Sequence, residues 1–247
     1  MMSLTSSLSS IASPQLFPHL EKGTLVLISS QVPVGTTHKL ERSYAEAYPD
    51  KAISFAYAPE NLRLGRAIEV FTDPDRVVVG LRSTSAESFS NDRDRVVALL
   101  QPFTERLEWM SVESAEMTKH ALNAFLATSV AFINEVSTLC EQVGADAKEV
   151  ERGLKSESRI GPRAYLNPGA AFAGGTLARD IAFLEAIGVE HQQPTPLLSG
   201  VRASNSNHRN WVRRKLQTLI GPCKIRKWRS GASPTSQAQI LSAGLIQ

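Results

Sequence analysis

Short apolar runs alternate with longer amphipathic segments along the first 112 residues. Gly, Pro and Asp bound the runs, which is typical of buried strands, and apolar residues in the longer segments recur at helical spacing. The expected strands are 24–30, 52–59, 73–80 (after a turn) and 106–112, and the expected helices are 37–48, a short one within 60–71, and 85–103. Strands alternating with helices predict βαβ units, so we expect a parallel sheet with right-handed crossovers.

The pattern changes at Glu113, where one unbroken helical segment begins and runs to Val143. It would be roughly 46 Å long at ~1.5 Å per residue. Gly144 is expected to end it, and Asp146 with Glu149 predicts the start of the next helix. Apolar residues occupy more than one face, which is typical of a buried helix. They are Ala121, Phe125, Val130, Phe132, Ile133, Val136 and Leu139.

These patterns predict an α/β domain with a parallel sheet, followed by an all-α dimerisation domain with one long central helix; the family resemblance described below implies that the sheet is a partial Rossmann-like one. We expect domains at 1–110 and 111–215, with a homodimer formed through residues 113–143. The segment 208–221 predicts one more helix. We expect residues 216–247 to be a disordered or remnant C-terminal segment, because helical and strand periodicity both disappear within it.

Charge is unevenly distributed. The chain of 247 residues has 27 Lys and Arg against 24 Asp and Glu, a net charge of +3, yet after Glu190 it has no acidic residue. Such a basic tail could bind nucleic acid or an anionic membrane. The alternative is a solvated or unnatural end. We favour the alternative, because pattern and acidic residues disappear together, as a shifted reading frame would produce, so nucleic acid is not an expected partner.

Targeting and cysteine signals are weak. No apolar run reaches ~18 residues, so we expect no transmembrane helix and no membrane partner. The first residues lack a basic region and an apolar core, which argues against a signal peptide, and they lack the Arg of a transit peptide. Cys140 and Cys223 form neither a disulfide framework nor a metal-binding spacing. We therefore expect a reduced, cytoplasmic protein without a metal site.

Two polar residues interrupt the long helix. Lys119 and Asn123 are four positions apart and share one helix face. A lysine in a mostly apolar helix is costly unless it is paired or lies in a polar cleft. One interpretation is a site where Lys119 stabilises an oxyanion and Asn123 orients a hydroxyl or water. The other is an exposed stripe of the helix.

Glu60 follows the second expected strand, at the edge where parallel α/β sheets bind ligands. It could serve as a general base or position water. It could also simply favour the positive N-terminus of the following helix.

The stretch FAGGTLARD places two glycines before an expected helix. Gly174 and Gly175 would permit close backbone approach, and the helix start favours an anion or a nascent oxyanion. Thr176 is either part of that site or a helix N-cap. Asp180 could hydrogen-bond a catalytic water or pair with Arg179.

Four stretches together resemble the UDP-glucose/GDP-mannose dehydrogenase family. They are SSQVPVGTT, YAPENLRLGRAIEVFTDPDRVVVG, SAEMTKHALNAFLATSVAFINEVSTLCEQVGAD and RIGPRAYLNPGAAFAGGTLARDIAFL. The resemblance implies oxidation of the primary alcohol of a nucleotide sugar to a carboxylate with two NAD. It also implies an N-terminal Rossmann domain and a central helical dimerisation domain.

The same resemblance implies roles for individual residues. Glu60 would assist attack by water, Lys119 and Asn123 would stabilise the reacting oxygen, and Asp180 would help to activate the lysine and water. Arg159 would reach the substrate of the partner subunit. The remaining implied positions line the substrate (Tyr165, Leu166, Phe172, Gly174) or contact the NAD (Gln31, Glu60, Arg179).

The chain departs from the family pattern where chemistry matters most. Thr176 stands where the family has a catalytic cysteine, which forms the thiohemiacetal and thioester of the second oxidation. The chain also contains no GxGxxG, the motif that seats the NAD pyrophosphate. We therefore expect the purified chain to turn over no nucleotide sugar with NAD. The alternative function is a non-catalytic dimerisation remnant or interaction module.

Overall fold

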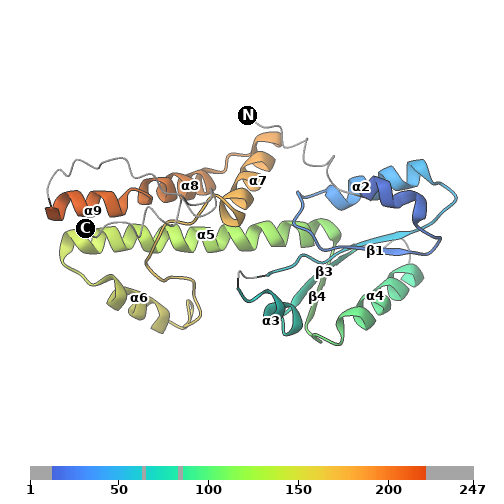
Figure 1. Cartoon of the computed structure of the whole chain (residues 1–247), viewed down its shortest axis with the longest axis horizontal. Coiled ribbons are helices and arrows are strands. Elements are labelled where there is room, and N and C mark those ends of the chain that lie inside the picture. The colour runs from blue at the N-terminus through green and yellow to red at the C-terminus, as the bar shows by residue number, and fades with distance from the viewer. Residues whose placement is uncertain (1–12, 63–64, 83–85, 221–247) are drawn as a thin grey trace. The chain divides into compact units, whose positions relative to one another are not determined.

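The computed structural model describes residues 13–62, 65–82 and 86–220 (Figure 1). The chain divides into two compact units, Met1–Lys119 and His120–Gln247. Helix α5 (Val112–Val143) begins in the first unit and continues as the longest element of the second.

A four-stranded sheet forms the centre of the first unit, with its strands in the order β1-β2-β3-β4. All four strands expected from the sequence are present, so the prediction of a Rossmann-like α/β fold with one long helix after it is confirmed. The strands are β1 (Leu25–Ile28), β2 (Ser54–Tyr57), β3 (Val77–Leu81) and β4 (Leu107–Met110). The helices of this part of the chain are α1 (Ser13–Leu16), η2 (Phe17–His19), α2 (Thr36–Ala47), α3 (Ala67–Thr72) and α4 (Ala86–Leu100).

The sheet is mixed, so the expectation of a parallel sheet is wrong at one pair of strands. β1 and β2 are parallel, as are β3 and β4, but β2 and β3 are antiparallel, with Tyr57 opposite Gly80. A parallel connection needs a crossover that packs on the sheet, usually a helix. Helix α3 has six residues and none is buried. Among the described residues between β2 and β3 the one helix has no buried side chain to pack as a crossover, which is consistent with the chain returning in the opposite direction.

Helices cover both faces of this sheet. Phe55 of β2 packs with Tyr44 of α2 on one face, whereas its neighbour Ala56 packs with Val96 of α4 on the other. Tyr57 points to the same face as Phe55 and packs against the start of α5. Alternation along β2 therefore explains the three layers, since successive strand residues point to opposite faces.

Close packing fixes the start of α5 on the sheet. A Cβ added at Gly80 would lie 2.8 Å from the Cα of Val112 and 2.8 Å from the Cβ of Ala115. Only glycine fits there without displacing backbone. The first turns of α5 are thus held against β3 by direct contact.

An ion-pair network joins helices α2 and α5 through Arg82. Its guanidinium donates to Glu41 and to Glu113, each at 2.6 Å. Burial alone would raise the pKa of the Glu113 carboxyl, but the hydrogen bond and charge of Arg82 outweigh it and hold that pKa below 4.5. Burial wins at Glu41, whose pKa is raised despite Arg82.

The second unit contains helices only in its described part. They are the rest of α5, α6 (Ala147–Ser156), α7 (Thr176–Glu190), α8 (Pro196–His208) and α9 (Trp211–Ile220). Gly144 has a φ of 74° after the end of α5, and the Asp146 carboxylate accepts the backbone N–H of Lys148 and Glu149. Both helix-boundary predictions are therefore confirmed.

The core of this unit forms where α5 meets α7 and α8. Small side chains of α5, such as Ala127, pack against Ile181 and Val201. The helix expected at 208–221 is confirmed as α9, but its start differs: α8 ends at His208 and α9 begins at Trp211. Residues 216–220 belong to α9, and the remainder of the segment expected to be disordered lies outside the described residues.

Helix α5 is long and apolar enough to cross a membrane by length and composition, with a mean hydropathy of 1.2 over its best window. The sequence-based expectation that no segment passes this test is therefore corrected. The test does not separate a membrane span from the core helix of a water-soluble unit. We assign α5 to the core, because it packs on α7 and α8 and carries buried polar side chains at Asn123 and Asn134.

Candidate active site

The carboxyl ends of β1 and β2 form one edge of the sheet, because these strands are parallel. The Ala58 N–H donates to the carbonyl of Ile28, and the Glu60 N–H donates to the carbonyl of Ser29. The two chain segments therefore continue side by side past the sheet. The structure places Glu60 at this edge, and Gln31 follows β1 on the neighbouring segment.

Lys119 of α5 is buried and reaches this edge. Its Nζ donates to the backbone carbonyl of Glu60 and to Oδ1 of Asn61, both at 2.8 Å. The interpretation of Lys119 as part of an exposed stripe is therefore wrong. The Glu60 residue itself is exposed and meets the lysine through its main chain, so a general-base role for its carboxylate stays a prediction.

Glu116, one turn before Lys119, belongs to the same region and was missed in the sequence. Its buried carboxylate accepts the Gly35 N–H at 2.5 Å, the Thr37 N–H at 2.9 Å and the Thr37 hydroxyl at 2.7 Å. The amides at a helix N-terminus favour an anion. The start of α2 thus holds a carboxylate of its own chain, which ties the segment after β1 to α5.

A second cluster lies between α5 and α7. The carboxylate of Asp180 is fully buried and accepts a hydrogen bond at each oxygen. Asn123 donates through Nδ2 at 2.5 Å, and His120 contacts the other oxygen through Nδ1 at 2.7 Å. Asn123 and Asp180, two residues chosen from the sequence, are therefore neighbours. His120 was missed, because its partner is 60 positions away.

The start of α7 is open. Gly175 is its N-cap residue and Thr176 its first residue, with no side-chain capping bond, so the interpretation of Thr176 as the N-cap is wrong. Thr176 is exposed. A Cβ added at Gly174 or Gly175 would meet nothing within 4 Å, and neither glycine has a positive φ. The described chain therefore does not itself require glycines here, and no side chain caps the amides of the first turn.

Two buried asparagines hold the loop before α7. Asn205 accepts the Phe172 N–H and donates to the Phe172 carbonyl, each at 2.9 Å. Asn134 accepts the Gly169 N–H at 3.0 Å and donates to the Ala170 carbonyl at 3.5 Å. The two side-chain amides thus satisfy loop N–H and C=O groups that regular secondary structure would otherwise pair with other backbone groups. The loop is thus fixed from α5 and α8.

The remaining predicted substrate-lining residues differ in exposure. Leu166 is buried and Phe172 packs on the core of the second unit, whereas Tyr165 is exposed. Arg159 is also exposed, and its guanidinium donates to Glu157 at 3.0 Å. The structure brings neither Tyr165 nor Arg159 into the Asp180 cluster, so their roles stay predictions.

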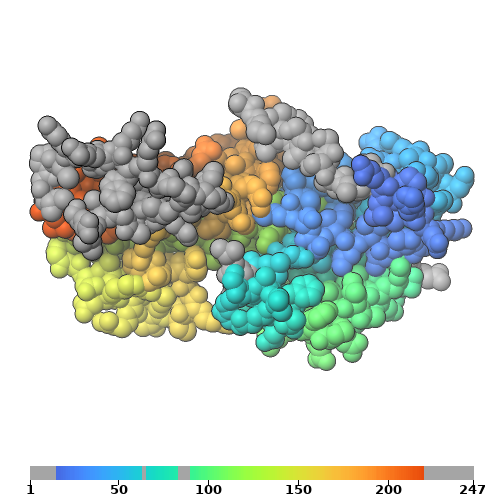
Figure 2. Space-filling view, viewed as in Figure 1, coloured from blue at the N-terminus to red at the C-terminus, as the bar shows by residue number. Residues whose placement is uncertain are grey.

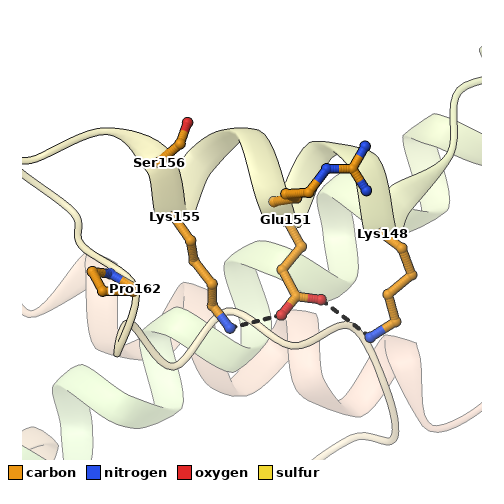
Figure 3. A pocket seen from close by; sticks show the side chains of 6 residues that line it. Lys148, Glu151, Lys155, Ser156 and Pro162 are labelled. Carbon is orange, nitrogen blue, oxygen red and sulfur yellow. Dashed lines mark hydrogen bonds and ion pairs between the residues drawn. The ribbon is translucent and has the colours of Figure 1, made fainter.

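A surface hollow of about 410 Å³ lies along α6 (Figure 3), in the part of the chain coloured yellow in the space-filling view (Figure 2). Glu151 lies between Lys148 and Lys155, at 3.1 and 2.7 Å (Figure 3). The hydrogen bond from Lys155, followed by that from Lys148, lowers the pKa of the Glu151 carboxyl. Arg152 pairs with Glu149 at 3.5 Å. Because these cations already have acidic partners, we assign no ligand to this hollow.

Within residues 13–62, 65–82 and 86–220, no group of three or more His, Cys, Asp or Glu side chains could hold a metal ion. Each unit instead holds a buried charged group in a hydrogen-bonded cluster. Lys119 is a cation held by two oxygen acceptors, and Asp180 is a carboxylate held by two nitrogen groups. The open start of α7 presents amides to an anion or oxyanion.

Several known proteins have sequences and folds similar to those of this chain. UDP-glucose 6-dehydrogenase from Rhizobium meliloti is 32% identical over 213 residues, covering 85% of this chain and 48% of that protein. UDP-glucose 6-dehydrogenase TuaD from Bacillus subtilis is 36% identical over 210 residues, covering 84% and 44%. The solved UDP-glucose dehydrogenase from Pyrobaculum islandicum has 27% identity and a TM-score of 0.76, covering 85% of this chain and 47% of that one.

This chain spans about half the length of the curated relatives that it matches. The NAD binding domain of the UDP-glucose/GDP-mannose dehydrogenase family matches residues 5–103, and the central domain of that family matches residues 113–207. The chain therefore belongs to the UDP-glucose/GDP-mannose dehydrogenase family, whose members are NAD-dependent oxidoreductases.

Proposed function

We propose that this chain handles a nucleotide sugar of the UDP-glucose type and keeps the groups that oxidise its primary alcohol, but has lost the step that makes the acid. The support for the first oxidation is the burial and hydrogen bonding of Lys119, Asn123 and Asp180. In that step a hydride leaves the alcohol carbon for NAD⁺ and the hydroxyl proton goes to a base, so charge develops on oxygen. Fixed polar groups stabilise such charge.

The observation that carries the proposal is Thr176, the exposed first residue of α7. Acid formation through a covalent intermediate requires a thiol that adds to the aldehyde to give a thiohemiacetal. The carbon of that adduct would lose a second hydride to a second NAD⁺ and become a thioester, which water would hydrolyse to the acid and the free thiol. A threonine hydroxyl is nearly unionised at neutral pH and forms no thioester. The four-electron oxidation is therefore interrupted at the aldehyde. Since the chain also has no GxGxxG, we expect no net turnover by the 247-residue chain alone.

The test pairs turnover with binding. The purified chain is incubated with NAD and either UDP-glucose or GDP-mannose, and NADH and sugar acid are measured. We expect neither product. Saturation-transfer NMR on the nucleotide sugars should show binding that Asp180→Asn weakens and Thr176→Ser leaves unchanged. Acid formation would overturn the argument from Thr176, and absence of sugar binding would overturn the proposed site.

A second function, homodimerisation, is favoured by one face of α5. Phe125, Phe132 and Leu139 are seven residues apart, and their exposed fractions are 69%, 49% and 63%. A straight helix drifts by about 20° per heptad, so the three side chains lie on one face. A contiguous exposed apolar face marks an interaction site, and an isologous contact between two copies buries it on both.

Phe125→Ser combined with Phe132→Ser tests this interface. We expect the wild-type chain to have a dimeric mass by light scattering at micromolar concentration and the double variant a monomeric one. Val189→Ser on α7 is the matched control, because Val189 is also exposed but lies off α5. A monomeric wild-type chain, or equal masses for both variants, would contradict the interface.

A cytoplasmic location is part of the same proposal. The thiol of Cys140 is free and buried, which suits a reducing compartment. Two cations of the basic segment also have acidic partners, Arg202 with Glu185 and Lys215 with Glu141. We therefore propose no nucleic acid for that segment.

A further inference from the structure

His120 is a buried titratable residue to which neither the sequence motifs nor the proposed chemistry assigns a role. It follows Lys119 on α5 and has no exposed surface. Its ring stands edge-on to Phe183 of α7, with centroids 5.2 Å apart and planes at 70°. Burying an imidazole in this way is costly unless its nitrogen atoms have partners.

The partner of the His120 ring determines which atom carries the proton. An ionised carboxylate only accepts hydrogen bonds, so the Nδ1 atom that lies 2.7 Å from Asp180 Oδ1 must be the donor. The same argument assigns Nδ2 of Asn123 to the other oxygen of Asp180, at 2.5 Å. Two donors, three residues apart on α5, therefore hold the two oxygens of one carboxylate.

This geometry has a consequence for Asn123. Its amide orientation is set by Asp180, and the Asp180 carboxylate is in turn fixed by the His120 N–H. Loss of that donor removes one of the contacts that fix the carboxylate, whose terminal torsion is a broad and soft one. The Asn123 amide would then lose its fixed acceptor.

We propose that His120 is a positioning residue: its Nδ1–H holds Asp180, and through Asp180 it holds the Asn123 amide. What Asn123 then orients rests on the proposed function, but the positioning itself does not. The role requires a donor at the place of Nδ1, whereas a role in packing alone requires only an apolar group of similar size.

Three substitutions separate these roles. His120→Asn puts an amide nitrogen where Nδ1 lies, His120→Gln puts one farther along the side chain, near the place of Nε2, and His120→Leu keeps bulk without a donor. The readout is hydrogen exchange of the Asn123 side-chain amide, measured by NMR on protein labelled with ¹⁵N-asparagine. The signal is assigned with Asn123→Ala. No turnover is needed, so failure here is distinguishable from failure of the proposed function.

We expect the Asn123 amide to be protected in wild type and in His120→Asn. It should lose protection by roughly tenfold or more in His120→Gln and His120→Leu, as expected when a carboxylate no longer holds the amide. The side-chain amides of Asn134 and Asn205 are internal controls, because both are buried in the same unit and bond to other partners.

Unchanged Asn123 protection in His120→Leu would overturn the proposal. Equal loss in His120→Asn and His120→Gln would also overturn it, since it would show that placement of the donor is irrelevant. If His120→Leu exposes the control amides as well, the Asn and Gln variants still decide. A difference between them at Asn123 alone supports positioning, and no difference refutes it.

Discussion

A thiol introduced at the start of α7 tests directly whether this helix N-terminus stabilises a negative charge. The perturbation is Thr176→Cys, which places a thiol at an exposed first helical residue with no capping side chain. The amides of the first turn lack intrahelical partners and carry the positive end of the helix dipole. They should therefore stabilise a thiolate.

The size of the effect follows from the exposure of the site. A charge at an exposed helix end gains about 0.3–1 kcal/mol, which is about 0.2–0.7 pKa units below the ordinary thiol value of about 8.5. The matched control is Glu190→Cys, at the last residue of the same helix, where the dipole has the opposite sign. The two thiol pKa values should therefore differ by about 0.4–1.4 units.

The assay is the rate of iodoacetamide alkylation between pH 6 and about 10, followed by mass spectrometry. Cys140 is buried and Cys223 is replaced by serine, so that the new thiol dominates. The whole pH profile is needed, because the intrinsic nucleophilicity of a thiolate falls as its pKa falls. A pKa of the Thr176→Cys thiol at or above that of the Glu190→Cys thiol would refute the reasoning.

Three further predictions concern stability, measured by urea unfolding. Gly80→Ala should destabilise the chain by about 1–3 kcal/mol, because its Cβ would strike the backbone of α5, whereas Gly200→Ala, where a Cβ meets nothing within 4 Å, should be neutral or stabilising. Asn205→Ala should cost about 1–3 kcal/mol for each of the two loop backbone groups that it leaves unpaired, and no loss would contradict the clamp. The stability advantage of wild type over Glu113→Gln should be full above the ordinary carboxyl value of 4.5 and should shrink as pH falls through the lowered folded pKa, because Arg82 stabilises the ionised form. An advantage that grows on acidification would contradict this sign.

The sequence predicted the elements of this fold better than their directions. Strand β3 has the same alternation and the same bounding residues whichever way it runs. Its direction depends on whether the preceding connection packs on the sheet. The short helix Ala67–Thr72 in that connection has no buried residue, and β3 runs antiparallel to β2. That is a tertiary property, which hydrophobic periodicity in a single segment does not contain.

The candidate site shows the same division. Lys119 and Asn123 share a helix face by spacing alone, so they could be paired from the sequence. Glu116 and His120 flank Lys119 on the same helix and were missed, because their partners lie 79 and 60 positions away. No local pattern reports such contacts. A buried charged residue in an apolar helix was nevertheless a usable signal, since burial of a carboxylate demands donors.

The asparagine clamps bear on the thermodynamics of ligand binding. Asn134 and Asn205 hold the loop at 169–172 through hydrogen bonds that come from the chain itself. Ordering a flexible residue costs about 1–2 kcal/mol of backbone entropy. For a four-residue loop this cost is met on folding instead of on binding, so an incoming sugar meets a surface that is already rigid. Its affinity should then carry little unfavourable conformational entropy, and loosening either clamp should weaken binding chiefly through that entropy.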